Sequence, residues 1–277
     1  MDQLDVIANM YKKHMEDPQQ IEQYLSKLWK SFSDKVEPEE LFNFNQDHFD
    51  WIEATKICKE YLQPEPTDII LEIWSGYWWV LSYLNKESWA KCIWIEIQKD
   101  RYETAKKLID MTNQNLNISF INGDFNEIQF SNTFDKIVSM WAIMHIIDKE
   151  KTLNKIWDLL KNWWKLYIED FVLWNNPTDE EKRILLENNS IPNLLTKKEY
   201  FSILESKGLK IVIDDNMTPH WTEYANNRVN NEKKMYEENV IAIGKEKTDA
   251  GLSFAQWVAD MFNKWVLNWV RFLAIKW

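Results

Sequence analysis

The chain is short of glycine and cysteine. It has only 5 glycines in 277 residues, whereas average usage of roughly 7% would give about 19. Its two cysteines, Cys58 and Cys92, form neither a CxxC pair nor a disulfide framework, which excludes a disulfide-stapled fold and suits a reducing cytoplasm. The four histidines are also sparse: His14, His48 and His220 lack the spacing that a metal site needs, so we expect no metal.

Long apolar runs and dense basic runs are missing as well. The longest mostly apolar stretch, Ile137 to Ile147, is shorter than the ~18 residues of a membrane span, and the N-terminus does not read as a signal peptide. A formal net charge of −11 without a basic block argues against binding to a phosphate backbone. We therefore expect a cytoplasmic protein with no nucleic-acid partner and no stable membrane insertion; the oligomeric state stays open.

The stretch from Asp68 to Glu96 organises the rest of the chain. It begins with the apolar run 69–73, which contains Glu72, and it closes with a second apolar run, 92–95, followed by Glu96. Continuous apolar runs are typical of parallel strands buried on both faces. A carboxylate at the tip of each of two neighbouring strands is what a ribose-bearing cofactor needs, and the spacing of these acids is close to that of known dinucleotide sites.

The turn between these two strands carries tryptophan where glycine is expected. A nucleotide-type cofactor crosses such a turn at contact distance from the backbone, which favours residues without a Cβ. Gly76 remains, but Trp74, Trp78 and Trp79 occupy the other positions. Reading these three residues as glycine gives E-I-G-S-G-Y-G-G, which resembles the acid-x-Gly-x-Gly-x-Gly motif of class I S-adenosylmethionine-dependent methyltransferases.

Composition supports the same interpretation. The 17 tryptophans and 5 glycines together make 22, close to the roughly 19 glycines of an average chain of this length. We interpret many of the tryptophans as standing at glycine positions, either through translation of UGA as tryptophan or through deliberate substitution. The alternative is a genuinely tryptophan-rich protein. Other tryptophans that fit the interpretation are Trp89, Trp94, Trp163, Trp164 and Trp277.

Alternation of apolar strands with helical segments predicts an α/β fold. We expect a Rossmann-like, seven-stranded, mostly parallel sheet with helices on both faces, an antiparallel last strand and the strand 69–73 in its interior. The remaining strands are expected at 118–121, 134–140, 165–170, 209–213 and 270–275. Helices are expected at 52–62, 100–113, 149–160, 177–189, 196–207, 220–239 and 253–264.

The chain divides into a short arm and one domain. Residues 1–50 have helical periodicity followed by a polar loop, and we expect them to act as an N-terminal helical lid. Residues 51–277 form the main domain, in which 171–250 contain a helical cap insertion for substrate recognition. No internal repeat appears.

Short motifs sharpen the resemblance. A-I-M-H-I at 142–146, E-A-T-K at 53–56, L-T-K-K-E-Y at 195–200, H-W-T-E-Y at 220–224 and V-R-F-L-A-I-K at 270–276 resemble phosphoethanolamine N-methyltransferases, with glycine/sarcosine-type N-methyltransferases as near relatives. Trp221, in the fourth motif, is a tryptophan in the resembled family too. The resemblance implies methyl transfer from S-adenosylmethionine to a small-molecule amine. Where that family has an acid before A-I-x-H, this chain has Met140 or Trp141, so the acceptor stays open.

The resemblance also implies roles for individual residues. His145 would orient or deprotonate the amine together with Tyr24, since an imidazole has a pKa near neutrality. Asp124 and Phe125 would hold and cover the adenine, and Tyr200, Lys264 or Arg101 could meet a substrate phosphate. The full set expected at the cofactor is Glu72, Trp74, Ser75, Gly76, Trp78, Glu96, Ile97, Arg101, Asp124, Phe125 and Met140.

Two other classes of function remain open at this point. A nicotinamide-dependent oxidoreductase also has a glycine turn and an acid after its second strand, but it does not require an acid two residues before the first glycine position, where Glu72 stands. A catalytically dead binding protein follows if the tryptophans are literal, because three indoles would fill the volume of the cofactor.

Overall fold

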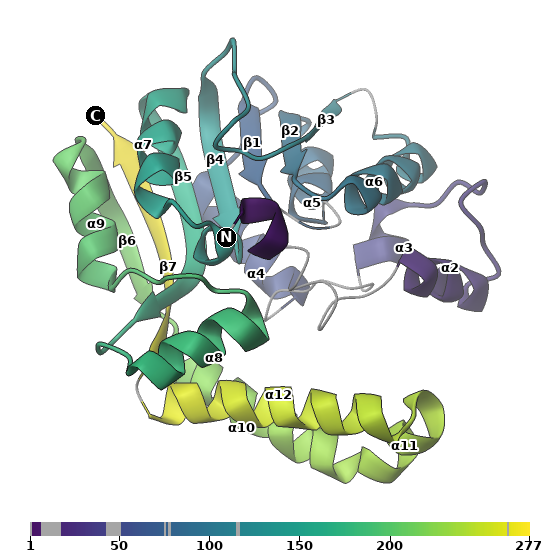
Figure 1. Ribbon diagram of the computed structural model, residues 1–277. Coiled ribbons are helices and arrows are strands. Elements are labelled where there is room, and N and C mark those ends of the chain that lie inside the picture. Colours follow the sequence, from purple (N-terminus) through teal and green to yellow (C-terminus); the bar gives the residue numbers. More distant parts are fainter. Residues whose placement is uncertain are drawn as a thin grey trace.

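The computed structural model describes residues 2–6, 18–42, 51–74, 76, 79–114, 117–264 and 266–277. Seven strands of this part of the chain form one sheet in the order β3-β2-β1-β4-β5-β7-β6 (Figure 1). The first five strands run parallel, and β7 is antiparallel to both of its neighbours. This confirms the expected fold class. The strands are β1 Ile69–Ile73, β2 Lys91–Glu96, β3 Ile118–Asn122, β4 Phe134–Met140, β5 Leu160–Leu173, β6 Leu209–Asn216 and β7 Leu267–Lys276.

Helices cover both faces of the sheet. Side chains of α4, α5 and α6 share one buried cluster with one face, and those of α7 and α9 share a second cluster with the other face. A third cluster joins the ends of β5 and β7 to α8, α10 and α12, which lie below the sheet in Figure 1. The helices are α2 Pro18–Lys27, α3 Pro38–Phe42, α4 Trp51–Leu62, α5 Trp79–Ser88, α6 Lys99–Thr112, η1 Ile143–His145, α7 Lys149–Leu159, α8 Asp179–Asn189, α9 Lys197–Ser206, α10 Thr218–Lys234, α11 Tyr236–Ile243 and α12 Lys245–Asn263.

Three expected elements differ from the structure by more than three residues at one end. The helix expected at 220–239 is two helices, because the backbone at Met235 leaves helical geometry and its N–H bonds back to the carbonyls of Asn231 and Lys233. The helix expected at 253–264 begins eight residues earlier, at Lys245, since a helix tolerates Gly251 at a cost of only about 1 kcal/mol. Strand β5 is longer than 165–170 because it pairs with β7 up to Leu173.

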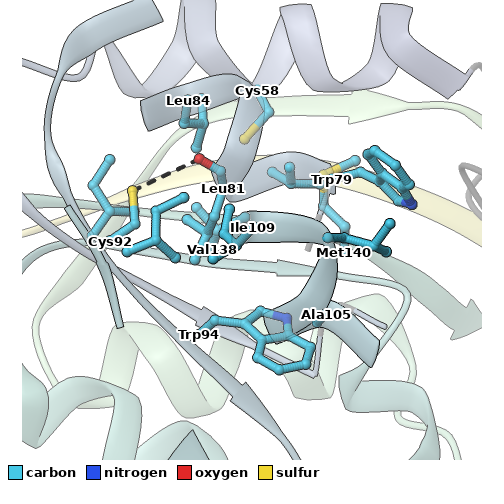
Figure 2. Close-up of a cluster of buried hydrophobic side chains, with 14 of the residues drawn as sticks. Cys58, Trp79, Leu81, Leu84, Cys92, Trp94, Ala105, Ile109, Val138 and Met140 are labelled. Atoms are coloured by element: carbon cyan, nitrogen blue, oxygen red, sulfur yellow. Dashed lines mark hydrogen bonds between the residues drawn. The ribbon is translucent and has the colours of Figure 1, made fainter. Parts of the chain in front are cut away.

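The core beneath α4, α5 and α6 is packed with sulfur and indole groups. Figure 2 shows Cys92, Trp94 and Trp79 among its aliphatic neighbours, with the Cys92 thiol directed at the carbonyl of Leu81, 3.8 Å away. Burial raises the pKa of the Cys92 thiol well above its ordinary value. Both cysteines are free and buried, so they act here as small apolar side chains.

Five tryptophans have a left-handed backbone. Eight non-glycine residues in the described part of the chain have a φ that suits glycine, and five of them are tryptophan, with φ between 53° and 69°. A bulky side chain is a clear outlier in this region because its Cβ crowds the following carbonyl. The backbone therefore supports the glycine interpretation at Trp29, Trp74, Trp89, Trp141 and Trp163.

The same criterion does not extend to four other tryptophans that the sequence placed at glycine positions. Trp79, Trp94, Trp164 and Trp277 are not among the described residues with a left-handed φ. Trp94 is fully buried and packs edge-on against Phe120, with ring centroids 5.0 Å apart. Backbone strain thus gives no reason to expect glycine at these positions. At Trp79, glycine is favoured only because a ligand would need the space that the indole fills.

Trp89 offers a direct test of the strain. It is 72% exposed and has a φ of 62°, so Trp89→Gly removes little packing while it relieves about 1–2 kcal/mol of left-handed strain, less about 0.5–1 kcal/mol for the freedom of glycine in the unfolded chain. We expect a net gain of roughly 1 kcal/mol, or about 2–4 °C in Tm, in thermal melts followed by circular dichroism.

A matched control is Trp174→Gly, because Trp174 is 54% exposed and has no left-handed φ. This control should lower Tm slightly. Equal changes in Tm for the two variants would contradict the strain argument.

Candidate active site

Three carboxylates lie at one edge of the sheet. Glu72 is near the end of β1, Glu96 ends β2, and Asp124 follows β3 after a single residue, Gly123. The first two are almost fully buried and Asp124 is half-buried. Because these strands are parallel, their carboxyl ends meet at the same edge, where ligands of open α/β sheets bind. The structure therefore brings together the three acids that the sequence assigned to the cofactor.

Glu96 connects the turn after β1 to the tip of β2. Burial raises its pKa to about 7, opposed by the Arg101 guanidinium and by backbone N–H groups of Gln98, Gly76 and Ile97. The N–H of Gln98 donates to Glu96 Oε1 over 2.8 Å. Arg101 is itself buried on α6, so it lies beside the carboxylate instead of in solvent.

Asn122 is a residue of this edge that the sequence reasoning missed. Its side-chain amide donates to the carbonyls of Glu96, at 2.8 Å, and Ile97, at 3.3 Å. The two bonds hold the tip of β2 against the tip of β3. The available signal was the sequence Asn-Gly-Asp directly after an apolar run, where polar side chains often hydrogen-bond nearby backbone.

Asp124 and Phe125 lie where an adenine is expected. Asp124 Oδ1 accepts from the N–H of Asn126 over 2.9 Å, and burial raises the pKa of the carboxyl. Phe125 is fully buried, with Lys155 Nζ 5.1 Å from its ring centroid. Asp124 is thus a half-buried hydrogen-bond acceptor at this edge, whereas the Phe125 ring is packed inside the core.

The turn after β1 does not fit a nucleoside as well as the acids do. Trp74 is 7% exposed and belongs to the same buried cluster as Ile97 and Phe125. Its backbone N–H donates to the carbonyl of Ile95 over 3.0 Å, which fixes the main chain that carries the indole. Met140 packs in the other cluster, as Trp79 does (Figure 2). The buried acids suit the ribose of S-adenosylmethionine, whereas the Trp74 indole shares a cluster with Phe125, a residue expected at the adenine. Ser75 and Trp78 lie outside the described residues.

His145 occupies a fixed position just past β4. It ends the short helix η1, is 7% exposed, and its Nδ1 lies 3.2 Å from the carbonyl oxygen of Ser190. A carbonyl only accepts hydrogen bonds, so Nδ1 carries the proton and Nε2 keeps its lone pair. Burial lowers the pKa of His145 to about 4, which keeps the imidazole neutral at pH 7.

The N-terminal turn is attached to the same loop. Gln3 donates its amide to the carbonyl of His145 over 3.0 Å and accepts from the N–H of Ile147 over 2.8 Å. Figure 1 shows this short helical turn in front of the central strands. Nothing in the sequence pattern singled out Gln3. Tyr24, the expected partner of His145, lies in α2, and its side chain is outside the described part of the structure.

A buried cation stabilises the loop from beneath. Lys149 Nζ donates to the carbonyls of Met144 and Ile146, at 3.0 and 2.8 Å, and to Asn193 Oδ1 at 2.6 Å. Burial lowers the pKa of Lys149 and raises that of Asp170, each opposed by the attraction of the other. These bonds join the His145 loop to the segment after α8.

Two of the three residues expected at a substrate phosphate have very different surroundings. Tyr200 is 1% exposed on α9 and packs edge-on against Phe272, with ring centroids 5.7 Å apart. Lys264 is exposed at the end of α12. Among the described residues, no three His, Cys, Asp or Glu side chains are grouped as a metal would require; His14 and His48 lie outside that part of the chain. No helix of the described ranges has the length and apolar character to cross a bilayer.

Comparisons with known proteins identify the family of the chain. Residues 81–249 match the methyltransferase domain family, and no curated protein matches the chain. A putative sarcosine dimethylglycine methyltransferase from Galdieria sulphuraria has a TM-score of 0.68 at 17% identity, covering 82% of this chain and 83% of that one. The cyclopropane synthase MmaA2 of Mycobacterium tuberculosis has a TM-score of 0.70 at 14% identity, covering 88% and 93%.

A third neighbour is phosphoethanolamine N-methyltransferase 2 of Haemonchus contortus in complex with S-adenosyl-L-methionine. It has a TM-score of 0.74 at 18% identity and covers 95% of this chain, while this chain spans 61% of its length. At such identities the three structures show the fold alone. The family match extends over more than half of the chain and confirms the expected enzyme class. The chain therefore belongs to the methyltransferase domain family and is an S-adenosylmethionine-dependent methyltransferase.

Proposed function

We propose that the chain methylates the nitrogen of a small-molecule amine. The observation that carries this proposal is the bond from His145 Nδ1 to the Ser190 carbonyl, which leaves the Nε2 lone pair at the carboxyl end of β4. S-adenosylmethionine supplies the methyl carbon and its own leaving group, so the protein mainly has to align an amine and manage one proton. A neutral imidazole at this position is suited to both tasks.

His145 acts in this proposal as an orienting group more than as a strong base. With a pKa of about 4, Nε2 takes a proton poorly, because catalytic bases work best with a pKa near the operating pH. It accepts a hydrogen bond from a neutral amine well. That bond directs the amine lone pair away from the imidazole, and the proton released by methylation passes to solvent.

The three acids have distinct proposed partners. Glu72 and Glu96 lie at the tips of adjacent parallel strands and are proposed to hold ribose hydroxyls or the first turn, with Ile97 beside the ring. Asp124 is proposed to accept from the adenine amino group, and Phe125 to cover the ring. Arg101 supports Glu96 by its charge.

The arm and the insertion are proposed to enclose the acceptor. Gln3 attaches residues 2–6 to the His145 loop, which supports a lid role for residues 1–50. Ser190, just after α8, attaches residues 171–250 to His145, which supports a cap role for that segment. An acceptor like phosphoethanolamine would need cations, and Lys264 remains the exposed candidate, while Tyr200 would have to leave its buried site.

Trp74 occupies space that the cofactor would need. A catalytically dead binding protein therefore stays an alternative for the literal chain, that is, the chain with tryptophan at these positions. The buried acids and the family match support an active methyltransferase. The Trp74 indole, in the same cluster as Phe125, opposes binding of the cofactor. Glycine at the turn reconciles the two observations. The nicotinamide alternative has no observation in its favour and serves as a control.

The first test is calorimetry with S-adenosylmethionine. The literal chain should bind it negligibly, whereas the variant with glycine at 74, 78 and 79 should bind measurably, because the backbone then reaches the ligand without a side chain between. The matched control carries glycine at 89 and 163, where two other left-handed tryptophans are exposed, and should bind no better than the literal chain. Binding of a nicotinamide dinucleotide instead, or equal binding by all three proteins, would contradict the proposal.

The second test concerns His145 in the variant with glycine at 74, 78 and 79, called the turn-glycine protein, to which Trp141→Gly is added because this left-handed indole also lies at the carboxyl edge of the sheet. His145→Asn keeps a donor near the Ser190 carbonyl but lacks a group at Nε2, so kcat on an accepted amine should fall by about 10²-fold or more with little change in Tm. His145→Gln places an amide oxygen near the Nε2 position and should keep more of the rate. The assignment is wrong if His145→Asn retains full turnover on every amine accepted.

A further inference from the structure

Trp141 is a left-handed tryptophan that the sequence motifs did not assign to glycine. It is the first residue after β4, has a φ of 60°, and its N–H donates to the carbonyl of Glu169 over 2.9 Å. This bond fixes the backbone, so the strain cannot be relieved by a different φ without breaking the pairing with β5. Glycine is therefore favoured at position 141 for the same reason as at Trp74 and Trp163, namely the left-handed φ.

The Trp141 indole lies inside a ring of other aromatic side chains. Its centroid is 4.4 Å from that of Trp269, 5.6 Å from Phe171 and 6.1 Å from Trp221. Trp269 also contacts the other two neighbours, with its ring centroid 4.5 Å from that of Phe171 and 5.2 Å from that of Trp221. They are nearly or fully buried and have ordinary φ values. A glycine at 141 would thus open an indole-sized cavity with three aromatic walls.

The position of this cavity suits the acceptor. Phe171 and Trp269 belong to β5 and β7, and Trp221 belongs to α10 of the cap. Met144, which precedes His145, is in the same buried cluster. The cavity would therefore lie between the carboxyl edge of the sheet and the cap, next to the helix that carries His145.

The chemistry of the walls favours a cation. Aromatic faces carry negative potential, so they attract an ammonium group that carries methyl groups and repel an anion. The indole N–H of Trp269 donates to Glu169 Oε1 over 3.1 Å, which polarises the ring and increases the electron density of its face. Arg271 Nε and the Tyr167 hydroxyl hold the same carboxylate, each at 2.9 Å, so its position is fixed.

We propose that Phe171, Trp221 and Trp269 form an aromatic cage for a methylated ammonium group, and that the Trp141 indole fills this cage in the literal chain. This inference rests on the proposed function and makes it more specific. The acceptor would be an amine that already carries one or more methyl groups, and the cage would also fit the methylated product. Desolvated cation contacts of this kind are worth about 2 kcal/mol or more.

The experiment compares two ligands of the same shape on the full chain carrying Trp141→Gly. Choline is the cationic probe and 3,3-dimethylbutan-1-ol its uncharged isostere, and binding is followed by tryptophan fluorescence and calorimetry without S-adenosylmethionine. We expect choline to bind at least tenfold more tightly than the isostere, and the literal chain to bind neither. Adding Trp269→Leu, which keeps an apolar wall, should remove the preference for choline.

Equal binding of both ligands would show an apolar cavity only and would overturn the cage, as would a folded Trp141→Gly protein that binds neither. If circular dichroism shows that Trp141→Gly does not fold, Trp141→Ala is titrated in the same way and should show the same preference. These titrations need no turnover, so a negative result would contradict the cage without contradicting methyl transfer. If the turn-glycine protein does not bind S-adenosylmethionine, the proposed methyl transfer is contradicted, and the choline titration still tests the cage separately.

Discussion

A left-handed backbone at the carboxyl edge of the sheet is the constraint on which the site depends. The chain must turn sharply after β1 and after β4, and in both places the first residue beyond the strand has a positive φ, at Trp74 and Trp141. The pairing of the strands imposes these conformations, since Trp74 donates to Ile95 and Trp141 donates to Glu169. Any residue with a Cβ is strained there, and a bulky one also extends into the space that the two turns enclose.

Buried polar groups hold the same edge in place from both sides. Glu169 receives bonds from Trp269, Arg271 and Tyr167 on the face toward α4. On the other side, Lys149 and Asn193 fix the loop around His145. Satisfied networks of this kind limit the positions available to their members, so the imidazole and the aromatic walls are organised before a ligand arrives.

Much of the fold was readable from the sequence because parallel strands are continuous apolar runs. The strands around Leu71, Ile93 and Ile137 were predicted in this way, and Glu72 and Glu96 at the ends of the first two followed from position alone. The helix break at Met235 was not predictable, because it depends on backbone bonds to Asn231 and Lys233 in a uniformly polar segment. Gln3, Ser190 and Asn122 were missed for a related reason: each acts through a hydrogen bond between a side chain and a main chain distant in sequence, which no local pattern records. Trp141 was recognised only from its φ, since no glycine motif includes it.

The insertion between β6 and β7 has its two ends on neighbouring strands. Asn216, the last residue of β6, pairs with Val270 of β7, so the chain leaves the sheet for α10, α11 and α12 and returns next to the place it left. Nothing in the order of the other five strands depends on the length or content of that excursion. The insertion is therefore a replaceable module: a different helical insert could be grafted between the same two strands while the acids of β1 and β2 stay in register.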